Sequence, residues 1–262
     1  PPKAEQFNRA GNNLDIQEFM VIPQKESFRE NFMIASEIYR KLQEIFQKNF
    51  GDPGQGEEGG FAPLINKTEQ ALLALRSAVE SRPETKFGLD VAATQFYKDG
   101  KYEFEGKTFG RGEMIEFYKD LVLRFPIAFI EDPFAEDDWL GFEAITKEFS
   151  NMPEKITILG DDLLTTNIER IKEAKGKMAC NGVIIKLNQI GTVTETLEAA
   201  KLAKLFDWKL LVSHRSGETM DTFIADLAAG INADYIKAGA PTAPERMVKY
   251  QRLIQIEQEI KK

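Results

Sequence analysis

Six short apolar segments of this chain each end in charged residues, and that regularity constrains the fold more than any other feature. In chain order, the charged ends are Asp90, Glu131, Asp161, Lys186, His214-Arg215 and Lys237. Continuous apolar runs of this length are typical of strands buried on both faces of a parallel sheet. A carboxylate at the end of a buried strand costs free energy unless a partner compensates it. Three acids followed by several bases therefore indicate a divalent cation beside an anionic ligand.

The spacing of these charged ends predicts alternating strands and helices. The intervals between them are 41, 30, 25, 28 and 23 residues, which suit units of one strand and one helix in a parallel sheet. Helical periodicity predicts helices over 27–49, 68–81, 113–124, 137–149, 167–174, 193–205, 221–229 and 243–260. Ser27 and Glu30 have the spacing of a capping box, and Gly51 is expected to end the first helix. A strand is expected over 16–22, a strand fragment over 4–8, and a hairpin turn at 98–101.

These elements predict an α/β fold, a (β/α)₈ TIM-type barrel, forming a single domain over residues 1–262. The length of 262 residues is close to the roughly 250 of a typical barrel, whose active site lies at the carboxyl ends of the strands. An open, doubly wound sheet is the alternative. That fold usually binds its ligand at one switch point and not at six strand ends.

Composition excludes several classes of protein. The net charge is −8 and the pI is about 5.0, which argues against a nucleic-acid partner because such proteins usually carry basic patches. No apolar run approaches the roughly 18 residues of a membrane span. Cys180 is the single cysteine, which rules out an internal disulfide and fits a reducing compartment. A cytoplasmic location is therefore expected.

Longer motifs at the same strand ends carry a resemblance to a known family. The motifs are Gln17–Met20, Glu57–Pro63, Asp90–Ala93, Ile130–Phe134, Gly160–Leu163, Lys186–Gly191, Ser213–Glu218 and Ile236–Pro241. With them, nearly the whole chain resembles enolase, in its C-terminal barrel region. The resemblance implies a glycolytic lyase that reversibly dehydrates 2-phosphoglycerate to phosphoenolpyruvate with Mg²⁺. Enolase-superfamily sites are known for a Lys or His base with one or two Mg²⁺ ions.

The resemblance also implies a role for each matched residue. Asp90, Glu131 and Asp161 match the metal ligands, Lys186 the base that removes the α-proton, and Glu58 the acid that protonates the leaving hydroxide, assisted by Glu18. Arg215 and Ser216 match the phosphate-binding residues, Lys237 the partner of the substrate carboxylate, and His214 and Gln17 other substrate-side residues.

The chemistry of these residues suits that scheme. Carboxylate oxygens are the ligands that Mg²⁺ prefers, and the ion would stabilise a dianionic ene-diolate as a Lewis acid. Lys186 must be neutral to act as a base, and nearby cations would lower its pKa. Glu58 must be protonated to act as an acid, and its acidic neighbours Glu57 and Glu18 would raise its pKa.

Two features of the family are absent from the printed sequence. Enolases have a preceding α+β domain, which contributes a mobile loop and takes part in the dimer contacts, and a longer Gly-rich loop near residues 7–12. We therefore read the chain as N-terminally truncated, with a homodimer expected at full length and little turnover by the chain alone. A non-catalytic barrel that serves a larger assembly is the alternative function. Another acid dehydratase of the superfamily is disfavoured, because Arg215 and Ser216 suit a phosphate.

Overall fold

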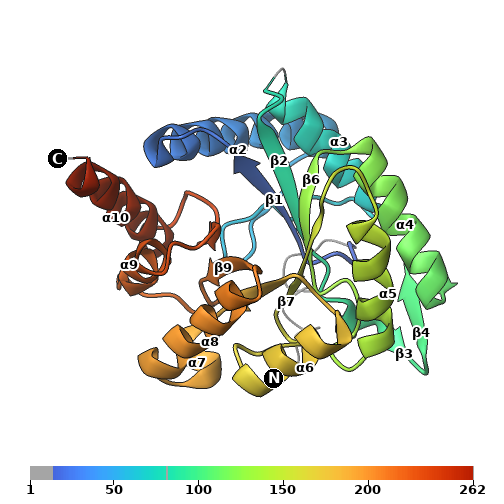
Figure 1. The fold of residues 1–262 in the computed structure, drawn as a ribbon. Coiled ribbons are helices and arrows are strands. Elements are labelled where there is room, and N and C mark those ends of the chain that lie inside the picture. The colour runs from blue at the N-terminus through green and yellow to red at the C-terminus, as the bar shows by residue number, and fades with distance from the viewer. Residues whose placement is uncertain (1–13, 81, 262) are drawn as a thin grey trace.

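The structure, a computed structural model, describes residues 14–80 and 82–261. Its centre is a curled seven-stranded sheet whose strands follow the order β1-β2-β6-β7-β8-β9-β10 (Figure 1). The strands are β1 (Glu18–Pro23), β2 (Thr85–Asp90), β6 (Ile127–Glu131), β7 (Thr157–Gly160), β8 (Gly182–Ile185), β9 (Lys209–Ser213) and β10 (Tyr235–Lys237). Spatial order equals chain order, so the sheet has no switch point and the doubly wound alternative is wrong.

The sheet is parallel from β2 to β10, as expected, but β1 runs antiparallel to β2. Among the described residues no ladder joins β1 to β10, so seven strands are present where the sequence predicted a closed barrel of eight. The strand fragment expected over 4–8 lies outside the described residues. What the described residues form is therefore a curled α/β sheet with one seam.

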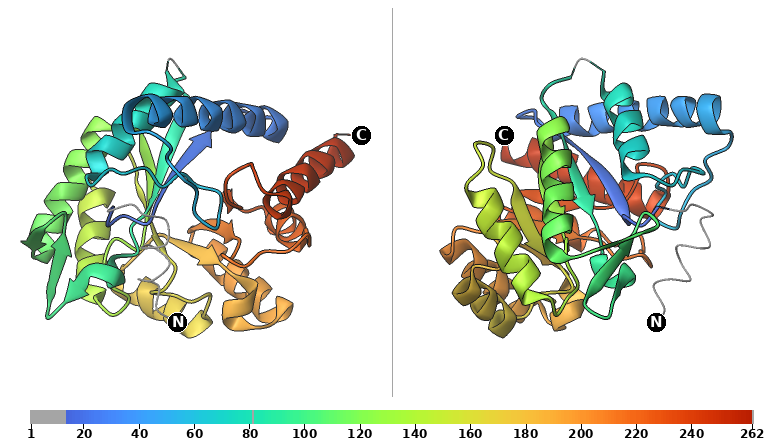
Figure 2. Two further views of the ribbon diagram at one scale, coloured as in Figure 1. Left: turned by 180° about the vertical axis from the view of Figure 1, so that it is seen from behind. Right: turned by 90° about the vertical axis from the view of Figure 1, so that its right-hand side faces the viewer.

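Helices cover the outer face of the sheet (Figures 1 and 2). They are α2 (Phe28–Phe50), α3 (Thr68–Val79), α4 (Arg111–Arg124), α5 (Trp139–Ser150), α6 (Ile168–Lys177), α7 (Leu187–Ile190), α8 (Val193–Leu205), α9 (Phe223–Gly230) and α10 (Pro244–Ile260), with the 3₁₀ helix η1 (Ala93–Phe96). All eight predicted helices are confirmed, within a few residues at their ends. The short α7 has no counterpart in the sequence prediction.

The predicted hairpin at 98–101 belongs to a separate three-stranded sheet beside the main sheet. Its strands are β3 (Tyr97–Lys98), β4 (Lys101–Phe104) and β5 (Lys107–Phe109). Asp99 and Gly100 both have positive φ, at 49° and 80°, which is the geometry of a tight hairpin turn. Buried Tyr102 ties this sheet to the main fold, since its hydroxyl donates to Asp138 Oδ2 at 2.6 Å.

Alternation along the strands divides the core into two parts. Side chains of one parity, such as Phe87, Val183 and Val212, pack outward against the helices. Side chains of the other parity fill the inside of the curled sheet, where Phe129 and Ile184 are buried in one cluster. A Cβ built on Gly88 would lie 2.3 Å from the Phe129 ring, so the glycine in β2 is needed to make room for that ring.

The helices α2 and α10 meet through a helix cap that local sequence did not reveal. Ser27 accepts from the amide of Glu30 at 3.4 Å, as the capping pattern predicted. The carboxylate of Glu257 in α10 accepts from the amides of Phe28 and Arg29 and from the Ser27 hydroxyl. The first turn of α2 is thus held by the last turns of α10. Gly51 ends α2 with φ 82°, as expected.

Within the described ranges, none of the helices has the length and apolarity that a membrane crossing requires.

Candidate active site

The carboxyl ends of the strands bring most of the predicted residues together. Because side chains alternate along a strand, a residue two positions after an interior residue points to the same side. The interior residues Phe129, Leu159, Ile184 and Tyr235 are followed at that offset by Glu131, Asp161, Lys186 and Lys237. The inward-facing residues are therefore apolar along the strands and charged at the carboxyl ends, where they form a cluster at the mouth of the sheet.

Lys237 lies at the centre of this cluster. Its Nζ is 3.0 Å from Glu18 Oε2, 2.9 Å from Asp90 Oδ2 and 3.1 Å from Glu131 Oε2. Burial works against the charged form of Lys237, but the three carboxylates outweigh it and raise its pKa well above the ordinary value. The resemblance gave Lys237 to the substrate carboxylate, whereas in the structure it pairs with two of the predicted metal ligands.

Lys186 forms its closest ion pair with Asp161, whose other oxygen accepts from Gln189 Nε2 at 3.0 Å. Burial lowers the pKa of Lys186, yet Asp161 and Glu131 outweigh burial and the pKa is raised. Of the cations expected to lower the pKa of Lys186, Lys237 acts in that direction, but Asp161 and Glu131 outweigh it. The reason is that the nearest neighbour of Lys186 is an anion and not a cation.

The predicted metal ligands are oxygen donors that suit a hard divalent cation. Glu131 is fully buried, and its Oε1 has no hydrogen-bond partner among the described residues. Burial, followed by repulsion from Asp90, raises its pKa well above the ordinary value. An unpartnered buried carboxylate oxygen is costly, so this atom fits the position of a cation ligand.

In the described part of the chain, the acids whose oxygens all lie within 4.8 Å of one another are Asp132, Asp161 and Asp162. That set is not the predicted one. The Asp132 carboxylate accepts from the backbone amides of Asp161 at 2.9 Å and Asp162 at 2.8 Å. Asp132 therefore holds the β7 loop that carries Asp161, and two of its lone pairs are already used.

Glu18 and Glu58 form a carboxyl pair on the other side of the site. Burial and then the charge of Glu18 raise the pKa of Glu58 to about 8. Burial also acts on Glu18, but the charge of Lys237 outweighs it and the pKa of Glu18 is lowered. Two adjacent carboxyls with pKa values pushed apart share one proton, and that proton resides on Glu58. The expected rise in the pKa of Glu58 is therefore present, with Glu18 as its charged neighbour.

The loop that carries Glu58 is fixed by backbone contacts. Ala240 donates to the Glu58 carbonyl at 2.9 Å, and the Tyr39 hydroxyl donates to the Gly59 carbonyl at 2.6 Å. Gly59 has φ 79°, and a Cβ there would lie 2.5 Å from Thr242 Oγ1. Two loops distant in sequence therefore pack closely and set the position of the Glu58 side chain.

His214 is buried between this acid and a cation. Its Nε2 lies 3.4 Å from Glu58 Oε2, and its Nδ1 is hydrogen bonded to Arg246 Nη1. Burial lowers the pKa of His214 to about 3, with Lys237 and Arg246 adding to the effect against the attraction of Glu18. His214 is therefore a neutral imidazole near pH 7.

Arg215 and Ser216 follow on an exposed loop. Their carbonyls accept from Arg246 at 2.8 and 2.7 Å. Within the residues that the structure describes, the Arg215 guanidinium has neither a hydrogen bond nor an ion pair to a side chain. Its five donors are thus available to an anion from solution.

Gln17 completes the set of predicted residues. Its Nε2 lies 3.4 Å from Asp90 Oδ2, and its Oε1 accepts from Gln95 Nε2 at 2.6 Å. Gln95 and Arg246 are site residues that the sequence did not single out. Asp132 lay within the recognised motif Ile130–Phe134, but it was given no role there. Gln189 was within a recognised motif, but nothing in its local sequence marked a contact to Asp161.

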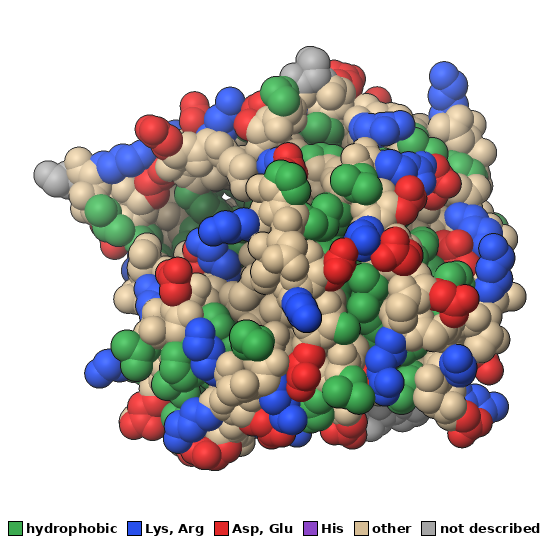
Figure 3. All heavy atoms as spheres, turned by 45° about the vertical axis from the view of Figure 1, so that its right-hand side comes forward, with side chains coloured by type: hydrophobic (Ala, Val, Ile, Leu, Met, Phe, Trp, Pro, Cys, Tyr) green, Lys and Arg blue, Asp and Glu red, His purple; other side chains and the backbone are tan. Residues whose placement is uncertain are grey.

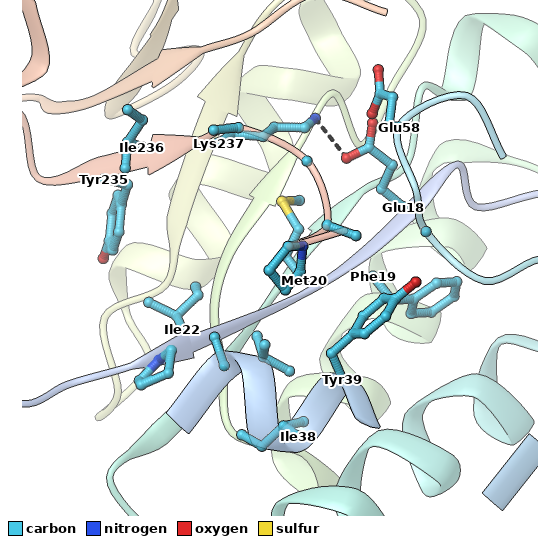
Figure 4. Close-up of a pocket in the computed structure, with 18 of the residues that line it drawn as sticks. Glu18, Phe19, Met20, Ile22, Ile38, Tyr39, Glu58, Tyr235, Ile236 and Lys237 are labelled. Carbon is cyan, nitrogen blue, oxygen red and sulfur yellow. Dashed lines mark ion pairs between the residues drawn. The ribbon is translucent and has the colours of Figure 1, made fainter. Parts of the chain in front are cut away.

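A groove of about 540 Å³ lies at the seam between β1 and β10 and opens onto Glu18, Glu58 and Lys237. Figure 4 shows Lys237 reaching from β10 toward Glu18, with Met20 and Ile22 along the wall below. On the face in Figure 3, Lys and Arg side chains are interspersed with Asp and Glu. The groove is thus apolar along the seam and charged at its mouth.

These features place the chain among the α/β proteins whose polar site lies at the mouth of a curled, mostly parallel sheet. It belongs to the family described as enolase, C-terminal TIM barrel domain, whose family model matches residues 6–262.

Three curated relatives, each named Enolase, support that assignment. The protein from Elusimicrobium minutum (strain Pei191) is 46% identical over 256 residues, covering 97% of this chain and 60% of the relative. The Methanocaldococcus jannaschii protein is 46% identical over 257 residues, covering 96% and 60%. The Aeropyrum pernix protein is 46% identical over 256 residues, covering 95% and 59%. The chain thus spans about 60% of the length of these relatives.

Proposed function

We propose that this chain carries the active site of a lyase that dehydrates 2-phosphoglycerate to phosphoenolpyruvate with Mg²⁺. The observation that carries the proposal is the carboxyl pair of Glu18 and Glu58, with the pKa of Glu58 raised to about 8, in the same site as Lys186. Dehydration of a hydroxy acid needs one group that takes a proton from carbon and another that gives a proton to the departing hydroxyl. This site holds a candidate for each role.

In the proposed reaction, the proton on C2 of the substrate moves to Lys186 Nζ. The electron pair left behind forms the C2–C3 double bond as the C3–oxygen bond breaks. Glu58 gives its proton to that oxygen, which leaves as water. The raised pKa of Glu58 supports the second proton transfer, because the carboxyl is still protonated near pH 7.

Asp90, Glu131 and Asp161 are the residues proposed to hold the metal, and Glu131 Oε1 is the oxygen without a partner among the described residues. When bound, a divalent cation would stabilise negative charge on the substrate as a Lewis acid. Neutralising Asp161 would remove the main charge that raises the pKa of Lys186. Lys186 would then more readily take the neutral form that a base requires.

The exposed Arg215 and Ser216 suit the phosphate of the substrate. A guanidinium can bind a phosphate through two parallel hydrogen bonds. Arg246, behind the loop, donates to the carbonyls of both residues and keeps the loop in place.

The test is the absorbance of phosphoenolpyruvate formed from 2-phosphoglycerate with Mg²⁺. It is run on the 262-residue chain and on a polypeptide that carries this chain at the length of its relatives. We expect turnover in the longer polypeptide, little in the shorter one, and losses of roughly 10²–10⁴-fold for Lys186→Ala and for Glu58→Gln. A longer polypeptide that folds, binds Mg²⁺ and shows no turnover would instead favour the non-catalytic role.

We also infer that one further strand lies along the seam and closes the sheet into the expected barrel. The groove beside β1 and β10 supports this inference, since both strands present an unpaired edge there among the described residues. Amide hydrogen exchange tests it. Protection of the edge amides of β10 in the longer polypeptide is expected, and rapid exchange at those amides would contradict closure.

A further inference from the structure

Arg246, on the first turn of α10, is a buried cation beside the site and takes no direct part in the proposed proton transfers. It is 1% exposed, and in the described ranges it makes no ion pair with a carboxylate. Its Nη atoms donate to the carbonyls of Arg215 and Ser216 and contact His214 Nδ1, while its Nε has no partner among the described residues. Burying a charge without a counter-ion is costly, so its contacts merit a chemical explanation.

The contact between Arg246 and His214 decides which ring nitrogen carries the proton. A guanidinium has only donors, so Nδ1 can be its partner only as an acceptor. If Nδ1 carried a proton, the N–H group of the imidazole would point at an N–H group of the Arg246 guanidinium in a buried position, and no hydrogen bond could form. A neutral imidazole has one proton, and with Nδ1 excluded it must lie on Nε2.

Nε2 faces the acid. It lies 3.4 Å from Glu58 Oε2, and a carboxyl oxygen accepts a hydrogen bond whether the group is protonated or ionised. The backbone of His214 is held independently, since its amide donates to the Lys237 carbonyl at 2.8 Å. The ring therefore lies between a guanidinium that is hydrogen bonded to Nδ1 and a carboxyl oxygen that is 3.4 Å from Nε2.

We propose that Arg246 is a positioning residue that fixes His214 as the Nε2–H tautomer, so that His214 presents a permanent hydrogen-bond donor to Glu58. The tautomer follows from the contacts alone. Its use in catalysis rests on the proposed function: once Glu58 has given up its proton, the Nε2–H group stabilises the resulting carboxylate. His214 itself neither gains nor loses a proton in that step.

The chain offers an unusually direct test, because His214 is its only histidine. In a ¹⁵N-labelled sample, one ring gives one pair of nitrogen resonances, whose positions and couplings to the ring protons identify the tautomer. We expect a protonated Nε2, an unprotonated Nδ1, and a coupling across the hydrogen bond from an Arg nitrogen to Nδ1. A proton on Nδ1, or on both nitrogens at pH 7, would overturn the proposal even if no variant folded.

Four variants separate the causes, each checked for folding by its amide spectrum. Arg246→Met should allow the proton onto Nδ1, whereas Arg246→Lys, which keeps a cationic donor, should preserve the wild-type tautomer. Lys249→Met is the matched control, because Lys249 is buried on the same helix and holds the same loop through Thr219 and Glu218. It should leave the tautomer unchanged, as should Glu58→Ala.

Two results contradict the assignment to Arg246. One is an unaltered tautomer in folded Arg246→Met. The other is a shift of the ring proton to Nδ1 in Glu58→Ala, since Glu58 would then be the residue that fixes the tautomer. Because the spectrum needs no substrate or metal, failure of the proposed reaction leaves this result intact. Conversely, turnover without the Nε2–H tautomer would reject only the role of Arg246.

Discussion

Lys237, at the end of β10, forms a buried ion pair with Asp90, at the end of β2, with 2.9 Å between Nζ and Oδ2. The two residues are 147 positions apart in the chain. Their pairing crosses the seam at which β1 and β10 have no ladder among the described residues. An ion pair thus connects the two sides of the seam, where no backbone hydrogen bonds between β1 and β10 are found among the described residues.

Lys237→Met should destabilise the protein strongly. The methionine keeps the apolar stem but leaves Glu18, Asp90 and Glu131 without their shared cation, and breaking a buried ion pair costs about 3–5 kcal/mol. Urea unfolding with and without Mg²⁺ measures the effect, and part of the lost stability should return with Mg²⁺. Lys209→Met is the control, because Lys209 pairs with Asp234 at the surface, where about 1 kcal/mol or less is expected. Equal losses in the two variants would contradict a special role for Lys237.

Glu131→Gln should weaken Mg²⁺ binding by more than the roughly 10–100-fold that changes around a metal ligand usually cost. The substitution keeps the shape of the side chain and removes the charge of the buried oxygen that has no partner among the described residues. Calorimetric titration of the folded protein with Mg²⁺ provides the measurement. Asp137→Asn, at an exposed position, should bind as the wild type does. Undiminished binding by Glu131→Gln would remove it from the metal site.

Arg215→Ala should lose affinity for phosphate and for 2-phosphoglycerate. A charge-assisted, two-pronged contact is removed, and Arg215→Lys should restore it only in part because an ammonium cannot bind in that planar geometry. Titration with each anion in turn compares the three proteins. If all three bind 2-phosphoglycerate equally well, the phosphate lies elsewhere in the site.

Glu58→Gln should become more stable relative to the wild type as pH rises. The pKa of Glu58 is about 8 in the folded protein against an ordinary 4.5, so the folded state binds the proton more tightly. The stabilisation that the folded state gains by binding this proton is complete below pH 4.5 and is lost as pH rises through about 8. The full shift at 1.36 kcal/mol per pKa unit sets an upper value of roughly 5 kcal/mol, and coupling to Glu18 makes the expected gain smaller than this value.

Unfolding free energies of wild type and Glu58→Gln at pH 5 and pH 9 test this expectation. Glu57→Gln, one position earlier and exposed, is the control and should show the same pH dependence as the wild type. A stability difference between Glu58→Gln and wild type that stays constant with pH would mean that Glu58 titrates normally.

The sequence by itself determined the fold class and the residues of the mouth. Apolar segments ending in charged residues at βα spacing require a parallel α/β sheet, and alternation along each strand places Glu131, Asp161 and Lys186 on one side of it. Both inferences depend only on local periodicity, which the order of residues records directly.

Only the tertiary structure decided how the charges pair. Lys237 contacts Glu18, Asp90 and Glu131, and Lys186 contacts Asp161, so the net effect of these neighbours is to raise the pKa of Lys186. Local periodicity determines on which face of a strand a residue lies, but it does not determine the distance from that residue to residues on other strands. A pKa depends on exactly those distances and on burial.

The same reason explains the residues that the sequence did not reveal. Arg246 and Glu257 both lie on α10. The local sequence pattern predicts that this helix forms, but not which residues elsewhere in the chain it contacts. In the structure Arg246 contacts His214, and Glu257 holds the start of α2. The seam at β1 and β10 was equally hidden, because ring closure depends on whether the two edge strands of the sheet meet. Elements follow from neighbours in the chain, whereas charge pairing and closure follow from neighbours in space.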